Sequence, residues 1–376
     1  MLRTSSVLSV LLSVLCFGPL LAGRPAIAGV PETPRFRILG VGEGLPSTRI
    51  NALARDRAGY LWIATGDGLA RYDGIGFRVW RHTPGDRNAL PGNNVQALHV
   101  DARDRVWVAT EGGGLSVLDA ARQHFHHYAM ARHPQIGSDD TFAIASRGHE
   151  LWFGTYEGGL HRLDQRGRIT RFMPRDNDPD SLPSATIWSL AADGNGMLWI
   201  GTDAGLARWD GRRMTRVALP GVAATTVNSV TLVDGDVWIG TSEGVWRRDR
   251  HGRWTQPAWS SLFAVPNRLM SLARDRDGAL WLGGVRGLWR AARDGIPAPV
   301  LPLPAMPGKA VPTLHLQADG ALWVPVMGAG LGYLRSDWRR LALFARGDGG
   351  LSGDIYRGVA RSVDGGIWLT ANTGVV

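Results

Sequence analysis

A tryptophan recurs at nearly even intervals through almost the whole of this chain. Successive members of the series are separated by 45, 45, 47, 39, 43, 42 and 45 residues, and each follows an apolar residue. A fixed period of 20–50 residues is typical of proteins built from stacked structural repeats. The chain is therefore expected to consist of about eight copies of one unit. The recurring residues are Trp62, Trp107, Trp152, Trp199, Trp238, Trp281, Trp323 and Trp368.

Each copy of the repeat predicts four short antiparallel strands. Alternating apolar residues mark the strands, and Gly and Asp mark the turns between them. Asp73-Gly74 is a hairpin signal, because the favoured two-residue turns need a positive φ. The strands expected in the first copy are residues 50–53, 60–65, 69–72 and 77–81.

Four antiparallel strands every 40–45 residues match a blade of an all-β propeller, in which neighbouring blades cover each other's faces. The recurring tryptophans are expected to fill the core between blades. Seven complete copies run from residue 36 to 345, and residues 346–376 begin an eighth copy that stops in its third strand. We predict a seven-bladed propeller of four-stranded antiparallel blades, followed by the start of a second propeller. The alternative is an eight-bladed ring in which Phe36–Leu39 supplies the missing outer strand.

The N-terminus resembles a secretory signal peptide over residues 1–28. Arg3 precedes an apolar run that ends near Leu21, and a small-residue cleavage site follows at Ala26-Ile27-Ala28. The single cysteine, Cys16, lies within this segment, so the mature chain is predicted to have no disulfides. An exported, periplasmic location follows from these features. An uncleaved membrane anchor remains the alternative.

The formal net charge of +9 comes almost wholly from arginine. A basic protein can bind nucleic acid when its charges are clustered. Here the arginines are spread singly through every copy, often beside Asp, and an exported protein rarely meets nucleic acid. We therefore expect no nucleic-acid partner.

The repeat resembles that of the two-component regulator propeller family. Gly-Leu-Pro precedes the inner strand and Leu-Trp-Ile-Gly-Thr-x-x-Gly-Leu-x-Arg follows it. The first copy carries the motif at Gly44-Leu45-Pro46, Asp56, Gly59, residues 61–65, Gly68-Leu69, Arg71 and Asp73, and the fourth at residues 198–202 and 205–208. Copies six and seven depart from it, with Gly283-Gly284-Val285-Arg286 and Pro325-Val326-Met327 in place of Gly-Thr. Irregular blades are expected there.

The resemblance implies an exported ligand-sensing region of a membrane-attached signalling protein. Its output would be a histidine kinase or diguanylate cyclase outside these residues, acting as a homodimer, and the chain would be a fragment or a truncated product. No enzyme activity is expected of the chain itself. Two alternatives remain open: a propeller enzyme similar to the virginiamycin B lyase group, and a scaffold that binds proteins at its blade edges.

Candidate ligand-binding residues lie where each blade meets the mouth of the central channel. Acidic residues recur in the turn after the tryptophan strand, and polar residues precede several inner strands. Converging carboxylates can accept hydrogen bonds from sugar hydroxyls or attract a cation. Asp and Glu also suit solvated turns, which is the alternative interpretation. The candidates for a small-molecule or oligosaccharide ligand are Asp67, Glu111, Glu157, Asp203, Glu243, Arg286, Asn93, Asn94, Asp139, Asp140, Asn267 and Arg268.

The histidines give no clear metal site. His124, His126 and His127 fall on an expected outer strand, without a fourth ligand at a fitting spacing. We expect neither a metal nor a cofactor, because no phosphate-binding loop or catalytic motif is present. His99 and His315, on inner strands, are the best bases for the lyase alternative.

Overall fold

The computed structural model describes residues 34–340, except 294 and 301–308, and residues 356–361, 363, 367–371 and 374–375. The chain divides into a large unit, Thr33–Leu341, and a smaller unit that includes Ala342–Val376. The expected signal peptide and the boundary at residue 345 lie outside the described residues.

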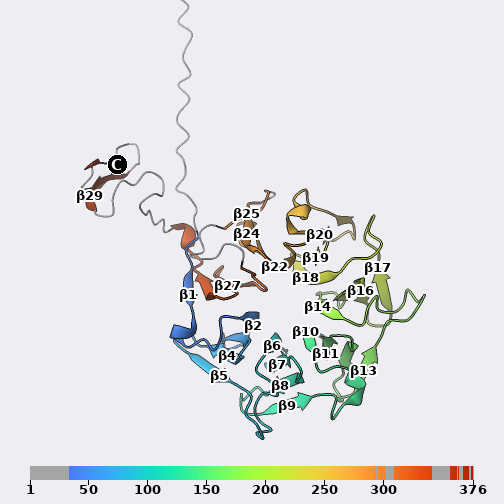
Figure 1. Cartoon of the computed structure of the whole chain (residues 1–376). Coiled ribbons are helices and arrows are strands. Elements are labelled where there is room, and N and C mark those ends of the chain that lie inside the picture. The colour runs from blue at the N-terminus through green and yellow to red at the C-terminus, as the bar shows by residue number, and fades with distance from the viewer. Residues whose placement is uncertain are drawn as a thin grey trace, which may run out of the picture. The chain divides into compact units, whose positions relative to one another are not determined.

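The large unit is a ring of seven four-stranded antiparallel sheets (Figure 1). Blade 1 is β2 (Ile50–Arg55), β3 (Leu61–Thr65), β4 (Gly68–Tyr72) and β5 (Phe77–Trp80). Blade 2 is β6 (Val95–Val100), β7 (Val106–Thr110), β8 (Gly114–Leu118) and β9 (Phe125–Tyr128). Blade 3 is β10 (Thr141–Arg147), β11 (Glu150–Thr155), β12 (Gly159–Leu163) and β13 (Ile169–Phe172).

The remaining blades repeat this order from the inner strand outward. Blade 4 is β14 (Ile187–Ala192), β15 (Leu198–Thr202), β16 (Gly205–Trp209) and β17 (Met214–Val217). Blade 5 is β18 (Val227–Val233), β19 (Asp236–Thr241), β20 (Gly244–Arg248) and β21 (Trp254–Thr255). Blade 6 is β22 (Leu269–Arg274), β23 (Leu280–Gly284), β24 (Gly287–Ala291) and β25 (Ala298–Pro299). Short 3-10 turns lie in the connections: η1 (Val41–Glu43), η2 (Pro134–Ile136), η3 (Ser260–Phe263) and η4 (Trp338–Arg340).

The seventh blade joins the two ends of the large unit. Its strands are β26 (His315–Leu316), β27 (Leu322–Val326), β28 (Gly330–Leu334) and, outermost, β1 (Arg37–Leu39). The seven-bladed prediction is confirmed. The segment that resembled an unassigned outer strand completes the seventh blade, so the eight-bladed alternative is not the observed arrangement.

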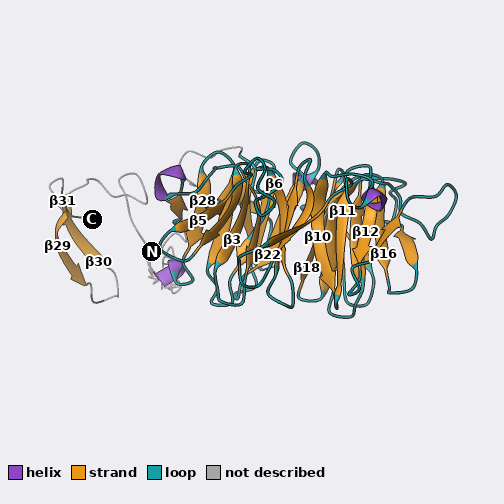
Figure 2. Ribbon diagram, turned by 90° about the horizontal axis from the view of Figure 1, so that it is seen from below, coloured by secondary structure: helices purple, strands orange, loops and turns teal. Residues whose placement is uncertain are grey.

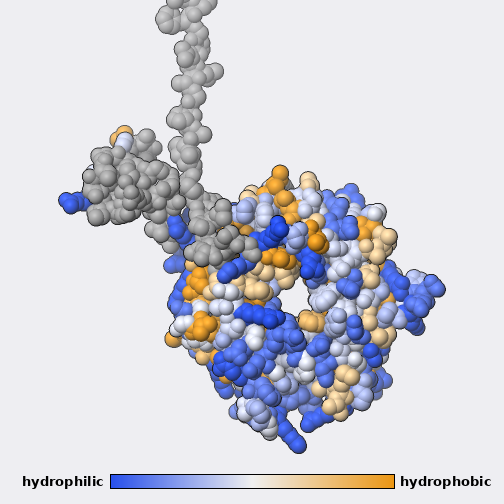
Figure 3. Space-filling view, in the orientation of Figure 1, coloured by the Kyte–Doolittle hydropathy of each residue, from blue (hydrophilic) through white to orange (hydrophobic). Residues whose placement is uncertain are grey.

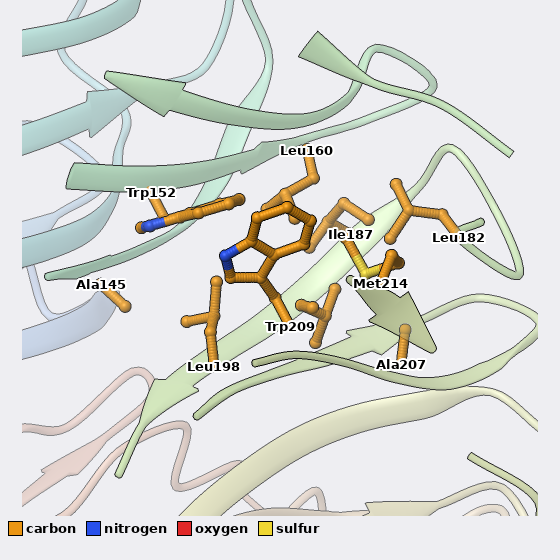
Figure 4. Close-up of a cluster of buried hydrophobic side chains, with 10 residues drawn as sticks. Ala145, Trp152, Leu160, Leu182, Ile187, Leu198, Ala207, Trp209 and Met214 are labelled. Atoms are coloured by element: carbon orange, nitrogen blue, oxygen red, sulfur yellow. The ribbon is translucent and has the colours of Figure 1, made fainter. Parts of the chain in front are cut away.

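The tryptophans of the repeat form the core between neighbouring blades, as the sequence predicted. In the ring blades these side chains are between 0% and 6% exposed. Figure 4 shows one such cluster, in which Trp152 of blade 3 and Trp209 of blade 4 lie 5.6 Å apart between ring centroids, beside Leu160, Leu198 and Met214. Each blade thus buries its apolar face against the next one.

The Thr of the repeat shapes the turn that ends the second strand. Thr65 Oγ1 donates to the carbonyl of Gly68 at 2.8 Å and accepts from the amide of Asp67 at 3.1 Å. Thr202 and Thr241 make the same hydrogen bond to Gly205 and Gly244. Because these hydroxyls are buried and satisfied locally, the turns are held in place beside the channel.

Blades 6 and 7 contain short strands, as blade 5 does in β21. The outer strand β25 and the inner strand β26 each span only two residues. Pro299 and Pro312 have no backbone N–H to donate to a sheet ladder, which accounts for short pairing at these positions. The second and third strands of both blades keep their five-residue lengths.

In the smaller unit, β29 (Tyr356–Arg361), β30 (Ile367–Ala371) and β31 (Gly374–Val375) form a three-stranded antiparallel sheet. The register matches that of a blade, because Ala360 pairs with Trp368 as Ala54 pairs with Trp62. Trp368 is 54% exposed, unlike the equivalent ring residues. That these residues begin a second propeller stays a prediction. Among the described residues, no helix has the length and apolar character needed to cross a membrane.

Candidate binding site at the channel mouth

The inner strands of blades 1–6 carry a β-bulge at the same place. In each, the register with the second strand shifts across the second residue of the inner strand, as between Ile50 and Ala52 or between Ile187 and Ser189. A bulge bends the strand and redirects a side chain, and such irregularities are common beside binding sites. The bulged residues are Asn51, Gln96, Phe142, Trp188, Asn228 and Met270.

All six bulged residues line one cavity of about 600 Å³ in the centre of the ring. Figure 3 shows the opening in the middle of the large unit, and Figure 2 shows its strands running between two loop-bearing faces. The cavity lies at the face where the inner strands begin, because Asp203, Val285 and Met327 from the turns after the second strands also line it. A mouth of this size can hold a small molecule of several rings.

A backbone hydrogen bond repeats around the mouth in all seven blades. The first residue of the turn after the second strand donates its amide to the carbonyl of a loop residue, which in blades 1 to 6 lies just before the inner strand. In blade 1, Gly66 donates to Arg49 at 2.9 Å, and in blade 4 Asp203 donates to Thr186 at 3.2 Å. The other pairs are Glu111 with Asn94, Tyr156 with Asp140, Ser242 with Thr226, Val285 with Arg268 and Met327 with Ala310. We call the donor residue of this bond the turn position of its blade and the acceptor residue the loop position.

The acidic candidates occupy two different places in this frame. Glu111 and Asp203 are at the turn position, whereas Asp67, Glu157 and Glu243 are one residue further along the turn. Asp67 pairs with Arg81, just past the outer strand, at 3.0 Å. The five acids of the sequence pattern therefore occupy two adjacent positions of the turn, and their role as a ring of ligand-binding carboxylates stays a prediction.

The acids that reach the mouth are held by neighbours. Glu111 accepts from Gln96 Nε2 at 3.0 Å and also from Asn94 Nδ2. Asp203 lines the cavity and accepts from Trp188 Nε1 at 3.3 Å. These two carboxylates fix the side chains of bulged residues.

The remaining sequence candidates divide between the cavity and its support. Arg268 lines the cavity. Asn267 is buried and structural, since it donates to the carbonyl of Leu262 at 2.8 Å and accepts from the amide of Arg286 at 3.0 Å. Asn93 likewise accepts from the amide of His82 at 2.7 Å.

The two aspartates of the loop into blade 3 also hold backbone groups. Asp139 accepts from the amide of Met130, and Asp140 accepts from that of Gly112. Both carboxylates thus tie this loop to its surroundings.

An aromatic cluster on blades 3 and 4 was not foreseen from the sequence. Phe142 and Trp188 lie 5.4 Å apart between ring centroids, and Tyr156 lies 6.3 Å from Trp188. Tyr156 is 43% exposed, so the cluster reaches the surface. The available signal was that the second residue of the inner strand changes widely between blades 1 and 6, while the residue after it is always Ala or Ser.

Amide side chains form the polar part of the cavity wall. Asn51 Nδ2 donates to the carbonyl of Val95 at 2.7 Å, and Asn228 Nδ2 donates to that of Leu269 at 2.6 Å. Each amide thereby ties its blade to the next. Asn228 Oδ1 has no hydrogen-bond partner, although it is shielded from bulk water. It is an acceptor that a ligand hydroxyl could satisfy.

Neither histidine proposed as a base lines the cavity. His99 Nε2 lies 2.7 Å from Ser146 Oγ of the next blade, and burial lowers the pKa of this histidine. Burial, with a contribution from Arg55, also lowers the pKa of His315. Within the described residues, no group of three or more His, Cys, Asp or Glu side chains could hold a metal ion.

The solved structures that resemble this chain include extracellular domains of signalling proteins. That of BT3049 from B. thetaiotaomicron, described as a hybrid two component system, is 21% identical with a TM-score of 0.71, and the match covers 91% of this chain and 49% of that chain. That of BT4673 from the same organism, described as a one component system, is 21% identical with a TM-score of 0.65, over 91% and 45%. This chain thus spans about half the length of those domains.

A structure of virginiamycin B lyase from Staphylococcus aureus is also similar. It is 14% identical with a TM-score of 0.59, and the match covers 80% of this chain and 98% of the lyase. Identities this low establish a shared fold and nothing further. No curated protein sequence matches the chain.

A family model described as two component regulator propeller matches three segments of the chain, residues 44–67, 89–112 and 181–204. Each segment runs from the loop before an inner strand to the turn after the second strand, in blades 1, 2 and 4. The matched segments contain the loop, bulge and turn positions that form the mouth. These three segments are two component regulator propeller repeats, which confirms the resemblance of the chain's repeat to that family.

Proposed function

We propose that this chain is the exported, periplasmic ligand-sensing propeller of a membrane-attached two component signalling protein. The observation that carries the proposal is the set of six bulged residues, because they direct six different side chains into one cavity on an otherwise repetitive scaffold. Variable side chains on a constant frame are typical of a recognition site. The family and the likeness to extracellular domains support the signalling context.

The cavity wall suits an oligosaccharide or a similar small molecule with hydroxyl-bearing rings. Phe142 and Trp188 offer apolar ring faces on one side of the mouth. Asn51 and Asn228 supply amides, and Asp203 supplies a carboxylate that can accept a hydrogen bond from a hydroxyl. Apolar surfaces with a few placed polar groups are the usual composition of small-molecule sites.

Ligand occupancy would be passed to a histidine kinase or diguanylate cyclase domain outside these residues, in a homodimer. This part of the proposal rests on the family. The gene sequence after the Val376 codon tests it: a spanning segment followed by a kinase or cyclase motif is expected. An immediate stop codon would contradict it and favour a stand-alone binding protein.

The lyase alternative has less support than the sensor. Neither of its candidate bases, His99 and His315, lines the cavity, and His99 instead contacts Ser146 of the next blade. The scaffold alternative has no specific observation in its favour.

Binding of oligosaccharides tests the site directly. In thermal-shift and calorimetric assays against an oligosaccharide panel, we expect at least one sugar to stabilise the protein. The Phe142→Ala/Trp188→Ala double variant should bind that sugar about tenfold more weakly, because it removes two ring faces worth about 0.5–1.5 kcal/mol each. Trp254→Ala, on the outer strand β21, is the matched control and should retain binding. Absence of any sugar-dependent shift, or an equal shift in the folded double variant, would refute the site.

A further inference from the structure

Charge is distributed unevenly around the channel mouth. In blades 2 to 4 the turn and loop positions carry Glu111, Asp140 and Asp203. In blades 6, 7 and 1 the turn position carries no acid, since it is Val285, Met327 or Gly66. The loop position of blades 6 and 1 is instead an arginine, Arg268 or Arg49.

Lys309 lies between these two arginines in the order of the blades. It precedes Ala310, the loop residue of blade 7, and its Nζ would be 3.2 Å from a Cβ atom placed on Gly328, in the turn of that blade. The amide of Gly328 in turn donates to the carbonyl of Thr48, next to Arg49. We call Arg268, Lys309 and Arg49 the basic arc, which spans three consecutive blades.

The cations of the basic arc are exposed, and no counter-ion for them lies in the part of the chain that the structure describes. Among the residues that the structure describes, none forms an ion pair or side-chain hydrogen bond with the side chains of Arg49, Arg268 or Lys309. By contrast, arginines elsewhere are commonly paired, as Arg81 is with Asp67 and Arg247 with Asp236. The sequence from 301 to 308, which precedes Lys309, contains no charged residue.

We propose that the basic arc binds a carboxylate, sulfate or phosphate group on the ligand that occupies the cavity. Arg268 lines the cavity and so connects the arc to the aromatic cluster and amides of the other blades. Guanidinium and ammonium groups without counter-ions form charge-assisted hydrogen bonds with anions, which are about twice as strong as neutral ones. This inference rests on the proposed function, because it names the chemical class of the ligand at the same site.

Simple anions test the arc without knowledge of the full ligand. In the first arm, sodium sulfate replaces sodium chloride at constant ionic strength, and the melting temperature and calorimetric binding are measured. In the second arm, glucuronate is compared with glucose, which has the same ring without the carboxylate. We expect sulfate, glucuronate or both to bind, and glucose to bind more weakly than glucuronate.

The Arg49→Gln/Arg268→Gln variant should lose about tenfold or more in anion affinity. Arg132→Gln is the matched control, because Arg132 is also exposed, lies on the loop between β9 and β10, and is distant in sequence from the arc. The control should bind anions as the unmodified protein does. No anion binding, or equal binding by both variants, would overturn the inference.

Lys309 provides an independent readout because it is the only lysine of the chain. Acetylation of its amine, followed by mass spectrometry of the peptide, should slow several-fold in the presence of the bound anion. An unchanged acetylation rate at saturating anion would remove Lys309 from the arc. The chain terminus, which also reacts, is resolved as a separate peptide.

Failure of this inference can be distinguished from failure of the proposed function. If neutral oligosaccharides bind through Phe142 and Trp188 while anions do not bind, the sensor site stands and the anionic class is wrong. If anions bind through the arc while the aromatic double variant binds every ligand as the unmodified protein does, the anion site stands and the proposed cavity ligand is wrong.

Discussion

At the scale of single residues, the Asp of the repeat accepts a hydrogen bond from the indole N–H of the buried tryptophan in the same blade. Trp62 Nε1 donates to Asp56 Oδ2 at 2.9 Å, and Trp107 Nε1 donates to Asp101 Oδ2 at 2.8 Å. Burial tends to raise the pKa of Asp101, but the hydrogen bonds from Trp107 and Arg105 outweigh it and lower this pKa. The Asp of the repeat therefore fixes the orientation of the indole as well as closing a turn.

Some tryptophans of the repeat lack this hydrogen bond. The indole N–H groups of Trp238 and Trp323 are buried without a hydrogen-bond partner. In blade 7, Gln317 stands where Asp56 stands in blade 1. Each unpaired buried donor costs about 1–3 kcal/mol, so blades 5 and 7 are expected to be held more by apolar packing than by this bond.

His161 predicts a specific loss of stability in acid. The side chain is fully buried in β12, stacks 4.7 Å from Phe153, and has no hydrogen-bond partner for either ring nitrogen. Burial, and to a lesser extent Arg171, lowers its pKa from 6.5 to about 4. The unfolded chain therefore binds a proton at a higher pH than the folded chain does. His161 therefore leaves the free energy of unfolding unchanged above about pH 6.5. As the pH falls toward 4, protonation of the unfolded chain lowers this free energy by about 3 kcal/mol in total.

Denaturant unfolding from pH 7.5 to 4, followed by tryptophan fluorescence, measures this contribution. The difference in unfolding free energy between His161→Leu and the unmodified protein should change with pH in that window. The exposed turn residue His251 gives the control, since His251→Leu should leave the pH dependence nearly unchanged. Parallel curves of unfolding free energy against pH for His161→Leu and the unmodified protein would show that this histidine does not cause the loss of stability in acid.

At the scale of elements, the glycine of the second strand sets how closely blades approach. A Cβ atom on Gly201 of β15 would lie 2.7 Å from the backbone oxygen of Val227, in the inner strand of the next blade. Gly240 and Gly283 stand at the same place and approach the backbone oxygens of Leu269 and Val311 in the next blade, whereas Gly154 approaches the Ile187 side chain. Blades 1 and 2 have Ala64 and Ala109 there, so the spacing is not identical around the ring.

Gly201→Ala should destabilise the ring by about 1–3 kcal/mol, because the added methyl group forces β15 away from β18. Gly194→Ala is the control, since a Cβ there meets nothing within 4 Å. Thermal unfolding of both variants measures the effect. Equal melting temperatures would mean that the interface relaxes without cost.

At the scale of the whole ring, closure depends on β1. Its residues pair with β28 through Arg37–Tyr333, Ile38–Gly332 and Leu39–Leu331. Leu39 is 2% exposed and belongs to the cluster that joins blades 7 and 1. A segment from the beginning of the large unit therefore completes a sheet made from its end, which removes an unpaired edge.

Leu39→Ala should lower the unfolding free energy by about 2–5 kcal/mol, the usual range for a buried leucine. Arg37→Ala, at the exposed end of the same strand, should change it far less. Chemical denaturation measures both values, and size-exclusion chromatography detects association through an opened edge. Indistinguishable effects of the two substitutions would argue against closure through β1.

The sequence by itself determined the blades and the tryptophan core, and it favoured seven blades over the alternative of eight. These features depend on alternation within a strand, on turn residues and on a period near 45, all of which are local and repeated. The positions of Asp67, Glu111 and Asp203 in turns were likewise predictable. Their partners were not, because Arg81 and Trp188 lie 14 and 15 residues away, and their geometry depends on how the strands are offset.

Only the tertiary structure decided which side chains meet at the mouth and which strand closes the ring. The bulge that directs Phe142 and Trp188 into one cavity is a shift of register between two strands, and composition does not reveal it. The basic arc joins Arg268, Lys309 and Arg49, which are far apart in sequence. Their places on three consecutive blades follow from the closure of seven blades into a circle, because that places the last blade beside the first.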